Sequence, residues 1–248
     1  MGATKIEFRL RVAILTVILT LGFWAPWIEA WRLGERIPLF AWLALTMSRL
    51  GLVSFAVATP LVVALGALTA AKGAVLRVWG TAWLGSATVN HTRMEAGGVL
   101  ADGPYRYVRN PLYLGSWCMF AAMALLMPPT GALFAMVLVT VFQLRLIFAE
   151  EAYLAGQLGQ PYLDYLRVVP RLFPHLRAIL SPTGLNPSSR KPQWLSSVLS
   201  ELNPIGVFIT LAFLSWSYDN LLMVKAIIVS FGVSLIVRAL LPMQDAGT

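Results

Sequence analysis

Long apolar runs separated by short polar stretches dominate the chain. They cover approximately residues 12–30, 39–71, 76–90, 111–127, 132–151, 204–218 and 221–241. About 20 helical residues are needed to cross the apolar layer of a bilayer, and most of these runs approach or exceed that length. The pattern predicts an all-α fold, a polytopic transmembrane helical bundle of about seven spans, with a range of five to seven.

The sequence supports some of these predicted spans better than others. The run at 76–90 is short and carries Arg77, so it is expected to be tilted or only partly inserted. In the second run, Arg49 separates a short leading piece from a full-length one, and Pro60 is expected to kink the latter. The first run is too long for a signal peptide and lacks a small-residue cleavage site, so it is interpreted as a retained anchor.

The same pattern divides the chain into four segments. We expect N-terminal transmembrane helices over 1–74, a core with most of the polar residues over 75–175, a linker or amphipathic segment over 176–203, and a C-terminal transmembrane hairpin over 204–248. The linker is rich in Pro, Ser and Lys, as loops are.

The amino-acid composition argues against several classes of function. The chain is 58% hydrophobic and 12% charged, with a formal net charge of +8. Its Lys and Arg residues are scattered at the ends of apolar runs, which is typical of topology-setting charges and does not indicate nucleic-acid binding. The single cysteine, Cys118, excludes an intramolecular disulfide, and the two histidines, His91 and His175, make a metal centre improbable. We expect no metal and no nucleic-acid partner.

The stretch DGPYRYVRNPLYLGSW, residues 102–117, departs most from the apolar pattern. Helix is expected to resume at Pro111, to end near Met127, and to be followed by a Pro-rich turn at 128–131 and a second helix over 132–151. Because two antiparallel helices of nearly equal length bring the start of one beside the end of the other, Arg109, Asn110 and Tyr113 should face Glu150 and Glu151.

The two ends of this hairpin have complementary chemistry. Asn110 before Pro111 suits a helix cap, and Arg109 beside a helix N-terminus makes a site for an anion. Glu150 and Glu151 fall at the predicted end of a helix, where the dipole disfavours carboxylates, so they need cations or donors.

Purely structural roles for these residues remain open. Arg109 and Glu150 can form a salt bridge that closes the hairpin, and the tyrosines of the loop, Tyr105, Tyr107 and Tyr113, can be interfacial aromatics. However, all of these residues coincide at one depth beside a Gly-rich polar loop. A zwitterion with a carboxylate, an ammonium group, ribose hydroxyls and a positive sulfur matches them, and S-adenosylmethionine fits that description.

These motifs resemble a known family. GPYRYVRNPLYLG, followed by Glu150-Glu151 and then by LGQPYLDYLRVVPRLFP, is similar to the isoprenylcysteine carboxyl methyltransferases and to their relatives, the phospholipid N-methyltransferases. The resemblance covers roughly residues 75–175. It implies an integral-membrane enzyme that uses S-adenosylmethionine and releases S-adenosylhomocysteine.

The resemblance also implies site residues. The cofactor-binding set would be Asn90, His91, Gly97, Gly98, Val99, Leu100, Tyr105, Asn110, Pro111, Leu112, Tyr113 and Glu150. Tyr162, Tyr165, Val169, Pro170 and Arg171 would fold back as a lid, with Tyr162, Tyr165 and Arg171 also near the substrate. Two features depart from the family: Asn110 stands where the prenylcysteine enzymes commonly have His, and the hairpin over 204–241 lies beyond the family core.

A mechanism follows as a hypothesis. Arg109 and loop N–H groups would orient the cofactor, and Glu150 would take an ammonium, a hydroxyl or the proton of the acceptor, with Glu151 as the other possible base. Arg145 would meet an anionic acceptor or, more plainly, a lipid phosphate.

The first functional hypothesis is methyl transfer to a lipophilic carboxylate or thiol, a form of lipid modification. The alternatives are a phospholipid N-methyltransferase acting on phosphatidylethanolamine-type amines, and a sterol-type reductase or non-catalytic membrane protein. The expected partners are membrane lipids and a lipophilic or lipid-anchored acceptor, with no obligate protein partner.

The expected location is a bacterial inner membrane, with the cofactor pocket facing the cytoplasm. Seven spans would then put the N-terminus outside, which Lys5, Arg9 and Arg11 oppose. A third segment that does not span would remove this conflict.

Overall fold

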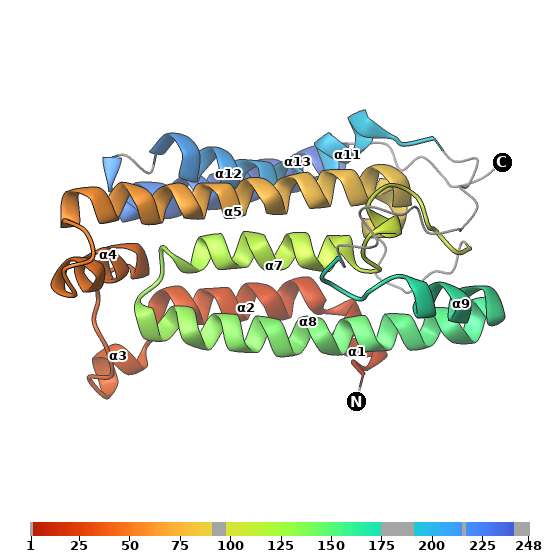
Figure 1. The fold of residues 1–248 in the computed structure, drawn as a ribbon, viewed down its shortest axis with the longest axis horizontal. Helices are drawn as coiled ribbons and strands as arrows, with labels where there is room; N and C mark the ends of the chain where they lie inside the picture. Colours follow the sequence, from red (N-terminus) through yellow and green to blue (C-terminus); the bar gives the residue numbers. More distant parts are fainter. Residues whose placement is uncertain (1, 91–97, 175–190, 215–216, 241–248) are drawn as a thin grey trace.

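The computed structural model describes residues 2–90, 98–174, 191–214 and 217–240. These residues form an elongated bundle of helices (Figure 1). The helices are α1 Lys5–Arg9, α2 Arg11–Trp24, α3 Trp27–Ala30, α4 Leu39–Arg49, α5 Phe55–Leu84, α6 Ser86–Asn90, the 3-10 helix η1 Gly103–Arg106, α7 Pro111–Ala124, α8 Pro129–Leu158, α9 Gln160–Val168, α11 Trp194–Ser200, α12 Leu202–Leu214 and α13 Asn220–Leu240. The predicted all-α bundle is confirmed.

Four stretches of the described chain are long and apolar enough to cross a membrane, namely Arg11–Ala30, Phe55–Leu84, Pro129–Leu158 and Asn220–Val237. A fifth is the pair α11 and α12, which meet at a bend of 67°. The shorter apolar helix α7 runs beside them. The expectation of about seven spans is therefore only approximate, because the described residues contain four candidate spans, or five if the bent pair is one span.

The third expected span does not exist as a separate helix. Residues 76–84 are the last turns of α5, which continues without a break from Phe55 to Leu84, and the chain then turns at Gly85 (φ 97°). The polar sequence around Lys72 and Arg77 does not interrupt the helix because intrahelical hydrogen bonds do not depend on side-chain polarity. The boundary expected at 74/75 consequently lies inside α5.

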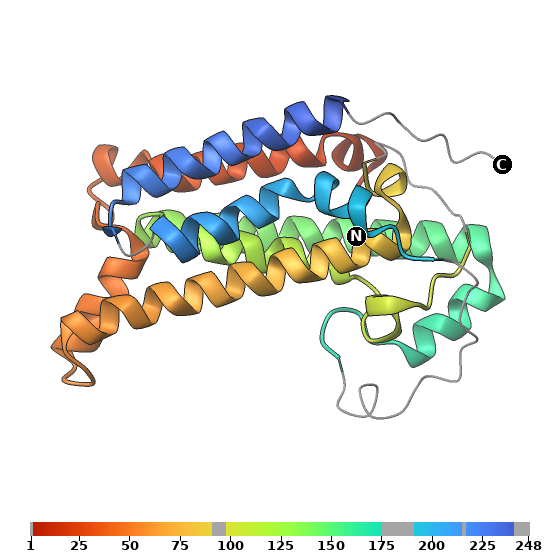
Figure 2. The ribbon, with the colours of Figure 1, turned by 90° about the horizontal axis from the view of Figure 1, so that it is seen from above.

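The position of the N-terminal segment bears on topology. Helix α1 and the end of α13 lie at the same end of the bundle as η1 and α9, as Figures 1 and 2 show. The N-terminal Lys5, Arg9 and Arg11 are therefore at the same end as the Arg-rich loop before α7. The conflict raised by an odd number of spans disappears.

The α7–α8 hairpin forms as expected but with different limits. Helix α8 already begins at Pro129 and continues to Leu158, so Glu150 and Glu151 lie inside it. The prediction of a helix end after Glu151 was wrong, because Ala152–Leu158 extends the helix until Gly159, which adopts φ 60°. Glu150 and Glu151 are therefore not exposed to the negative end of a helix dipole, although the antiparallel arrangement still brings them to the start of α7.

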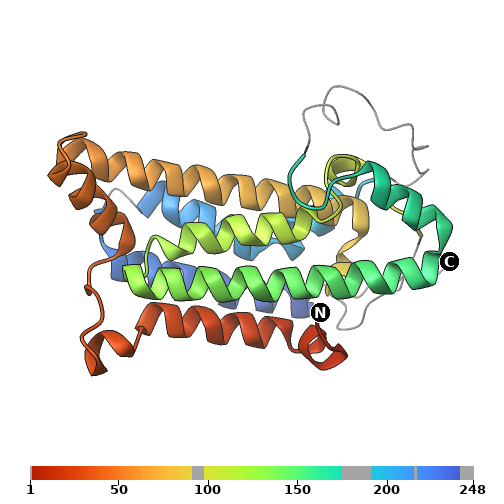
Figure 3. The same ribbon diagram turned by 60° about the horizontal axis from the view of Figure 1, so that its bottom comes forward.

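Small residues let the helices pack closely. Gly22 of α2 contacts Gly131 of α8, and Gly73 of α5 contacts Gly115 of α7, at positions where a Cβ atom would meet backbone atoms. Figure 3 shows α8 lying between α2 and α7. These contacts hold the α7–α8 hairpin between α2 on one side and α5 on the other.

Candidate active site

The site forms where the loop before α7 meets the segment after α9. The backbone N–H of Arg109 donates to the carbonyl of Pro170 (2.8 Å), and that of Asn110 donates to the carbonyl of Arg171 (3.2 Å). Asn110 is held out of the helical conformation (φ −124°, ψ 57°) by the proline that follows it, and its carbonyl accepts the first helical bond from Leu114. Segments 61 residues apart are thus joined through their backbones.

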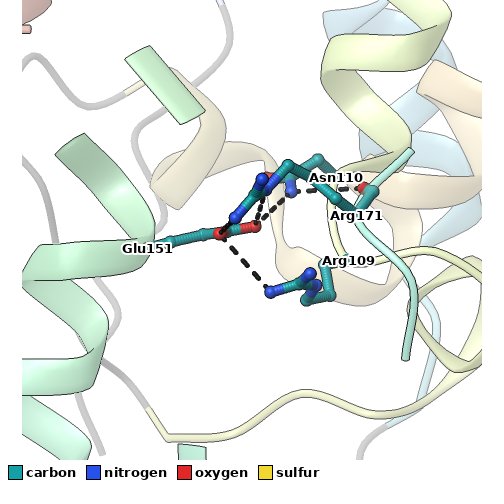
Figure 4. Close-up of polar contacts among 4 residues, drawn as sticks. All are labelled: Arg109, Asn110, Glu151 and Arg171. Atoms are coloured by element: carbon teal, nitrogen blue, oxygen red, sulfur yellow. Dashed lines mark hydrogen bonds and ion pairs between the residues drawn. The ribbon is translucent and has the colours of Figure 1, made fainter. Parts of the chain in front are cut away.

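Glu151 is the centre of this junction (Figure 4). Its carboxylate accepts hydrogen bonds from the Asn110 amide (2.9 Å), from Arg171 Nε and Nη2 (the shortest 2.8 Å), and from Arg109 Nη1 (3.4 Å). Its side chain is 8% exposed. Two guanidinium groups and an amide therefore bind one buried carboxylate, and the hydrogen bond to Glu151 raises the pKa of Arg171.

These contacts correct two expectations. Arg109 pairs with Glu151, and Glu150 instead accepts a hydrogen bond from the hydroxyl of Tyr113 (2.9 Å). Adjacent residues of a helix point about 100° apart, so the two carboxylates face different neighbours. Asn110 occupies the N-cap position, but its side chain does not cap α7; it bonds Glu151 and the carbonyl of Arg171 (3.3 Å).

Tyr105 lies in η1. The first residue of this helix, Gly103, has φ 53° and packs against the indole of Trp83. Tyr105 is 8% exposed, and the Tyr105 hydroxyl has no hydrogen-bond partner among the described residues. Burial, together with the nearby Glu150 carboxylate, raises the pKa of Tyr105 well above its ordinary value. The hydroxyl is therefore a neutral donor at physiological pH.

The segment after α8 packs against the loop before α7. Tyr165 donates to the carbonyl of Tyr105 (2.8 Å), and Tyr162, Tyr165 and Val169 form a small buried cluster with Ala101. Burial raises the pKa of both phenols. Helix α9 is thereby fixed over the loop that contains Tyr105, and Arg171 continues from it to Glu151.

The remaining expected residues differ in burial and packing. Val99 packs against the α9 cluster, Gly98 is exposed with φ 112°, and Leu100 is partly buried. Pro111 is fully buried, and Leu112 packs beside Gly80 of α5. His91, Gly97 and the side chain of Asn90 lie outside the described residues.

Arg145 does not reach the Glu151 junction. Its guanidinium donates to both carboxylate oxygens of Glu7 (2.9 Å each), and its carbonyl accepts from the N–H of Ala3 (2.9 Å). It thus fixes the N-terminal segment on α8. The expectation that Arg145 meets an anionic acceptor finds no support in these contacts.

The sequence interpretation missed a second polar cluster, formed by Arg77, Thr81, Ser116 and Glu201 behind the α5–α7 contact. Glu201 is completely buried there. The signal was available, since ionisable residues inside apolar runs mark sites that require a partner.

The arrangement suits a polar ligand. Besides the Tyr105 hydroxyl, Nε of Arg109 is buried with no partner among the described residues. Buried donors without partners are rare in folded proteins, and a ligand is one explanation for them. Carboxylate and hydroxyl oxygens would accept from both groups, and Glu150 can meet an ammonium or a proton donor. The donors therefore fit S-adenosylmethionine. Among the described residues, no group of three or more His, Cys, Asp and Glu is placed to hold a metal ion.

Comparison with known proteins agrees with this chemistry. Residues 61–160 match the family model described as phospholipid methyltransferase. The matched region runs from α5 through the α7–α8 hairpin, and it includes Arg109, Asn110, Tyr113, Glu150 and Glu151. No curated protein and no solved structure matched the chain.

The match covers less than half of the chain, and together with the helices that could span a membrane it suggests a membrane methyltransferase. The match is consistent with the group that contains the isoprenylcysteine carboxyl and phospholipid methyltransferases, and the resemblance stated from the sequence is confirmed.

Proposed function

We propose that this membrane methyltransferase uses S-adenosylmethionine and methylates a lipophilic acceptor that enters from the bilayer. The observation that carries the proposal is two buried donors without partners among the described residues: Tyr105 Oη, which has the Glu150 carboxylate nearby, and Nε of Arg109, whose guanidinium pairs with Glu151. Donors of this kind are offered to acceptor oxygens, which the cofactor carries in its carboxylate and ribose. When bound, the cofactor supplies an electrophilic methyl group on a positively charged sulfur.

The chain's own residues would position the reactants. Glu151 fixes Arg109, Asn110 and Arg171 relative to one another, so that the loop before α7 keeps one geometry. Helix α9, through Tyr165, covers the loop and would exclude water from the reacting groups. Transfer to a carboxylate or thiolate needs no further acid or base, because such an acceptor is already nucleophilic. A lipophilic carboxylate or thiol, of the kind found in isoprenylcysteine, is therefore our first candidate.

A phospholipid amine is the second candidate. The observation that favours it is the Glu150 carboxylate, held by the Tyr113 hydroxyl (2.9 Å) and not consumed by the arginines that bind Glu151. An amine acceptor must lose a proton, and Glu150 is placed to receive it. The printed description of the matching family, phospholipid methyltransferase, points the same way.

The cytoplasmic side is the proposed location of the site. In Figure 1, α9 and the loop before α7 lie at the same end of the bundle as α1. These elements and the segment after α9 carry Arg106, Arg109, Arg167 and Arg171, and the N-terminal segment carries Lys5, Arg9 and Arg11. Positive residues near membrane spans favour the cytoplasmic side, where S-adenosylmethionine is also made. A bacterial inner membrane is the expected membrane.

Ligand-dependent thermal stability of the purified protein tests the proposal. A ligand that binds the folded state raises its unfolding temperature, and S-adenosylhomocysteine should do so while NADPH should not. Stabilisation by NADPH alone would instead indicate a reductase, and no response to either would overturn cofactor use. Incorporation of labelled methyl into prenylcysteine analogues or into phosphatidylethanolamine then separates the two acceptor classes.

A further inference from the structure

The segment that leads into the C-terminal hairpin is joined to the core by an ion pair between the fully buried Glu201 and the partly buried Arg77. Glu201, which is 0% exposed, accepts from Arg77 Nε at 2.6 Å and from Arg77 Nη2 at 2.9 Å. It lies at the 67° bend between α11 and α12, so the break in the helix directs its carboxylate towards α5. In Figure 2, α12 runs alongside α5.

Glu201 and Arg77 also form hydrogen bonds with side chains of α5 and α7. Thr81 Oγ1 donates to Glu201 Oε1 (2.7 Å), and Arg77 Nη1 donates to Ser116 Oγ of α7 (2.6 Å). Ser116 in turn donates to the carbonyl of Leu112 (2.9 Å), in the first turn of α7. A chain of short hydrogen bonds therefore runs from the C-terminal hairpin to the helix start that carries Asn110 and Tyr113.

The last turns of α5 also support the loop before α7. Gly80 packs against Leu112 and Pro111, Trp83 packs against Gly103, and the rings of Trp79 and Tyr107 are 6.1 Å apart. Residues 77–83 thus pack against both η1 and the start of α7. Glu201 binds the same stretch of α5 through Arg77 and Thr81, and the N–H of Gln193 adds a hydrogen bond to the carbonyl of Ala82 (2.8 Å).

We propose that Glu201 is a positioning residue of the methyltransferase site, and that the C-terminal hairpin is through it an obligatory part of the enzyme. The inference rests on the proposed cofactor use at the Glu151 junction. Glu201 lies outside the segment that matches the methyltransferase family, residues 61–160, and the site it supports lies inside that segment. Its effect passes through Arg77 and Ser116, without contact with the reactants.

Removing one partner alone is an ambiguous test, because an unpaired buried charge can prevent folding. The informative variant replaces both, Arg77→Met with Glu201→Met, since apolar pairs of similar volume often preserve stability. We expect this double variant to stay folded and monodisperse in detergent, but with S-adenosylhomocysteine affinity reduced on the order of tenfold. A purely structural ion pair would instead leave the affinity at the wild-type value, and that result would overturn the proposal.

Ser116→Ala keeps the ion pair and removes only its connection to α7. We expect weaker cofactor binding with little change in the unfolding temperature. Thr140→Ala is the matched control, because Thr140 likewise accepts from a neighbouring helix, at Trp117 Nε1 (2.9 Å), and donates to its own helix, at the Met136 carbonyl (2.7 Å). Equal losses of affinity in the two variants would contradict a specific connection through Ser116.

Amide hydrogen exchange over residues 109–116 gives a readout that needs no cofactor. The double variant should exchange faster there than the wild type, while the matching stretch around Thr140 stays protected. If the wild type binds no S-adenosylhomocysteine, the proposed function fails, and the exchange data still decide whether Glu201 positions the start of α7. Unchanged exchange would overturn the positioning role even if the wild type binds the cofactor product.

Discussion

The side-chain amide of Asn110 donates to the Glu151 carboxylate at 2.9 Å, and the two residues are 41 positions apart in the chain. This bond joins the start of α7 to the C-terminal part of α8. Arg109 and Arg171 complete the coordination of the same carboxylate, so Glu151 connects three segments of the chain. The contribution of each residue can be measured.

Glu151→Gln removes the only countercharge that the structure shows for Arg109 and Arg171 among the described residues. We expect a loss of roughly 1–3 kcal/mol in the free energy of unfolding, because buried donors lose their acceptor, and a loss of S-adenosylhomocysteine binding. Thermal unfolding and calorimetry of the detergent-solubilised protein measure both. Glu29→Gln is the control, since Glu29 pairs with Arg36 in an exposed contact of 3.5 Å. Wild-type affinity in Glu151→Gln would refute the role given to this carboxylate.

Tyr105→Phe should move stability and affinity in opposite directions. The Tyr105 hydroxyl is buried without a partner among the described residues, so its removal is expected to leave the unliganded protein as stable or to stabilise it by about 1 kcal/mol. If the hydroxyl binds the cofactor, affinity for S-adenosylhomocysteine falls. Tyr165→Phe is the comparison, because Tyr165 donates to the Tyr105 carbonyl at 2.8 Å and should lose stability. A destabilised Tyr105→Phe with unchanged affinity would show that the hydroxyl has a structural partner instead.

Glu150→Gln distinguishes the two acceptor classes. If an amine is methylated and Glu150 receives its proton, kcat should fall by about 10²–10⁴ with phosphatidylethanolamine. With a carboxylate or thiolate acceptor no proton is transferred, and kcat should change little. Tyr113→Phe, which removes only the hydrogen bond to Glu150 (2.9 Å), should have a smaller effect. Equal turnover of an amine substrate by wild type and Glu150→Gln would exclude Glu150 as the base.

Gly103→Ala should disturb the site through the backbone. Gly103 has φ 53°, and a Cβ atom there would collide with the indole of Trp83. We expect lower stability and weaker cofactor binding, because η1 carries Tyr105. Gly156→Ala is the matched control: Gly156 lies within α8, with nothing within 4 Å of an added Cβ, so this variant should gain about 0.5–1 kcal/mol. Circular-dichroism melting of both variants checks the contrast.

Acid should release the N-terminal segment from α8. The backbone N–H of Thr4 and the Arg145 guanidinium lower the pKa of Glu7 below its ordinary value of 4.5. A depressed carboxylate pKa stabilises the folded state above the unfolded pKa, and this contribution is lost as the pH falls through the folded pKa. The difference in unfolding temperature between wild type and Arg145→Gln should therefore be constant from about pH 7 to pH 5 and shrink below about pH 4.5. A difference that persists at lower pH would mean that Arg145 stabilises the segment without Glu7.

Part of the site could be predicted from the sequence because its geometry depends on one short connection. The short Pro-containing connection between Ala124 and Pro129 makes α7 and α8 antiparallel, and this was enough to bring Asn110 and Tyr113 to the Glu pair. The sequence did not predict which of these residues pair with one another. Which of two adjacent glutamates meets Arg109 depends on the rotation of α8 about its axis, and packing against α2 and α7 sets that rotation.

The predicted helix limits were wrong where an apolar run ends but the helix continues. The run at 76–90 was separated from its predecessor because of its charges, but α5 continues through them, with Arg77 bound to Glu201. The extension of α8 beyond Glu151 was missed for the same reason, because polar residues end an apolar run without ending a helix. Partners for charges in apolar runs come from distant segments, and one sequence does not specify which.

The sequence by itself determined the membrane class, the helical architecture and the residues that gather at the start of α7, because bilayer thickness and a short turn leave few alternatives. The tertiary structure decided the rest. It assigned Glu151 to Arg109 and Arg171, Glu150 to Tyr113, and the C-terminal hairpin to Arg77 through Glu201. The physical reason is that a buried charge takes whichever partner packing places within hydrogen-bond distance, and packing depends on the whole bundle at once.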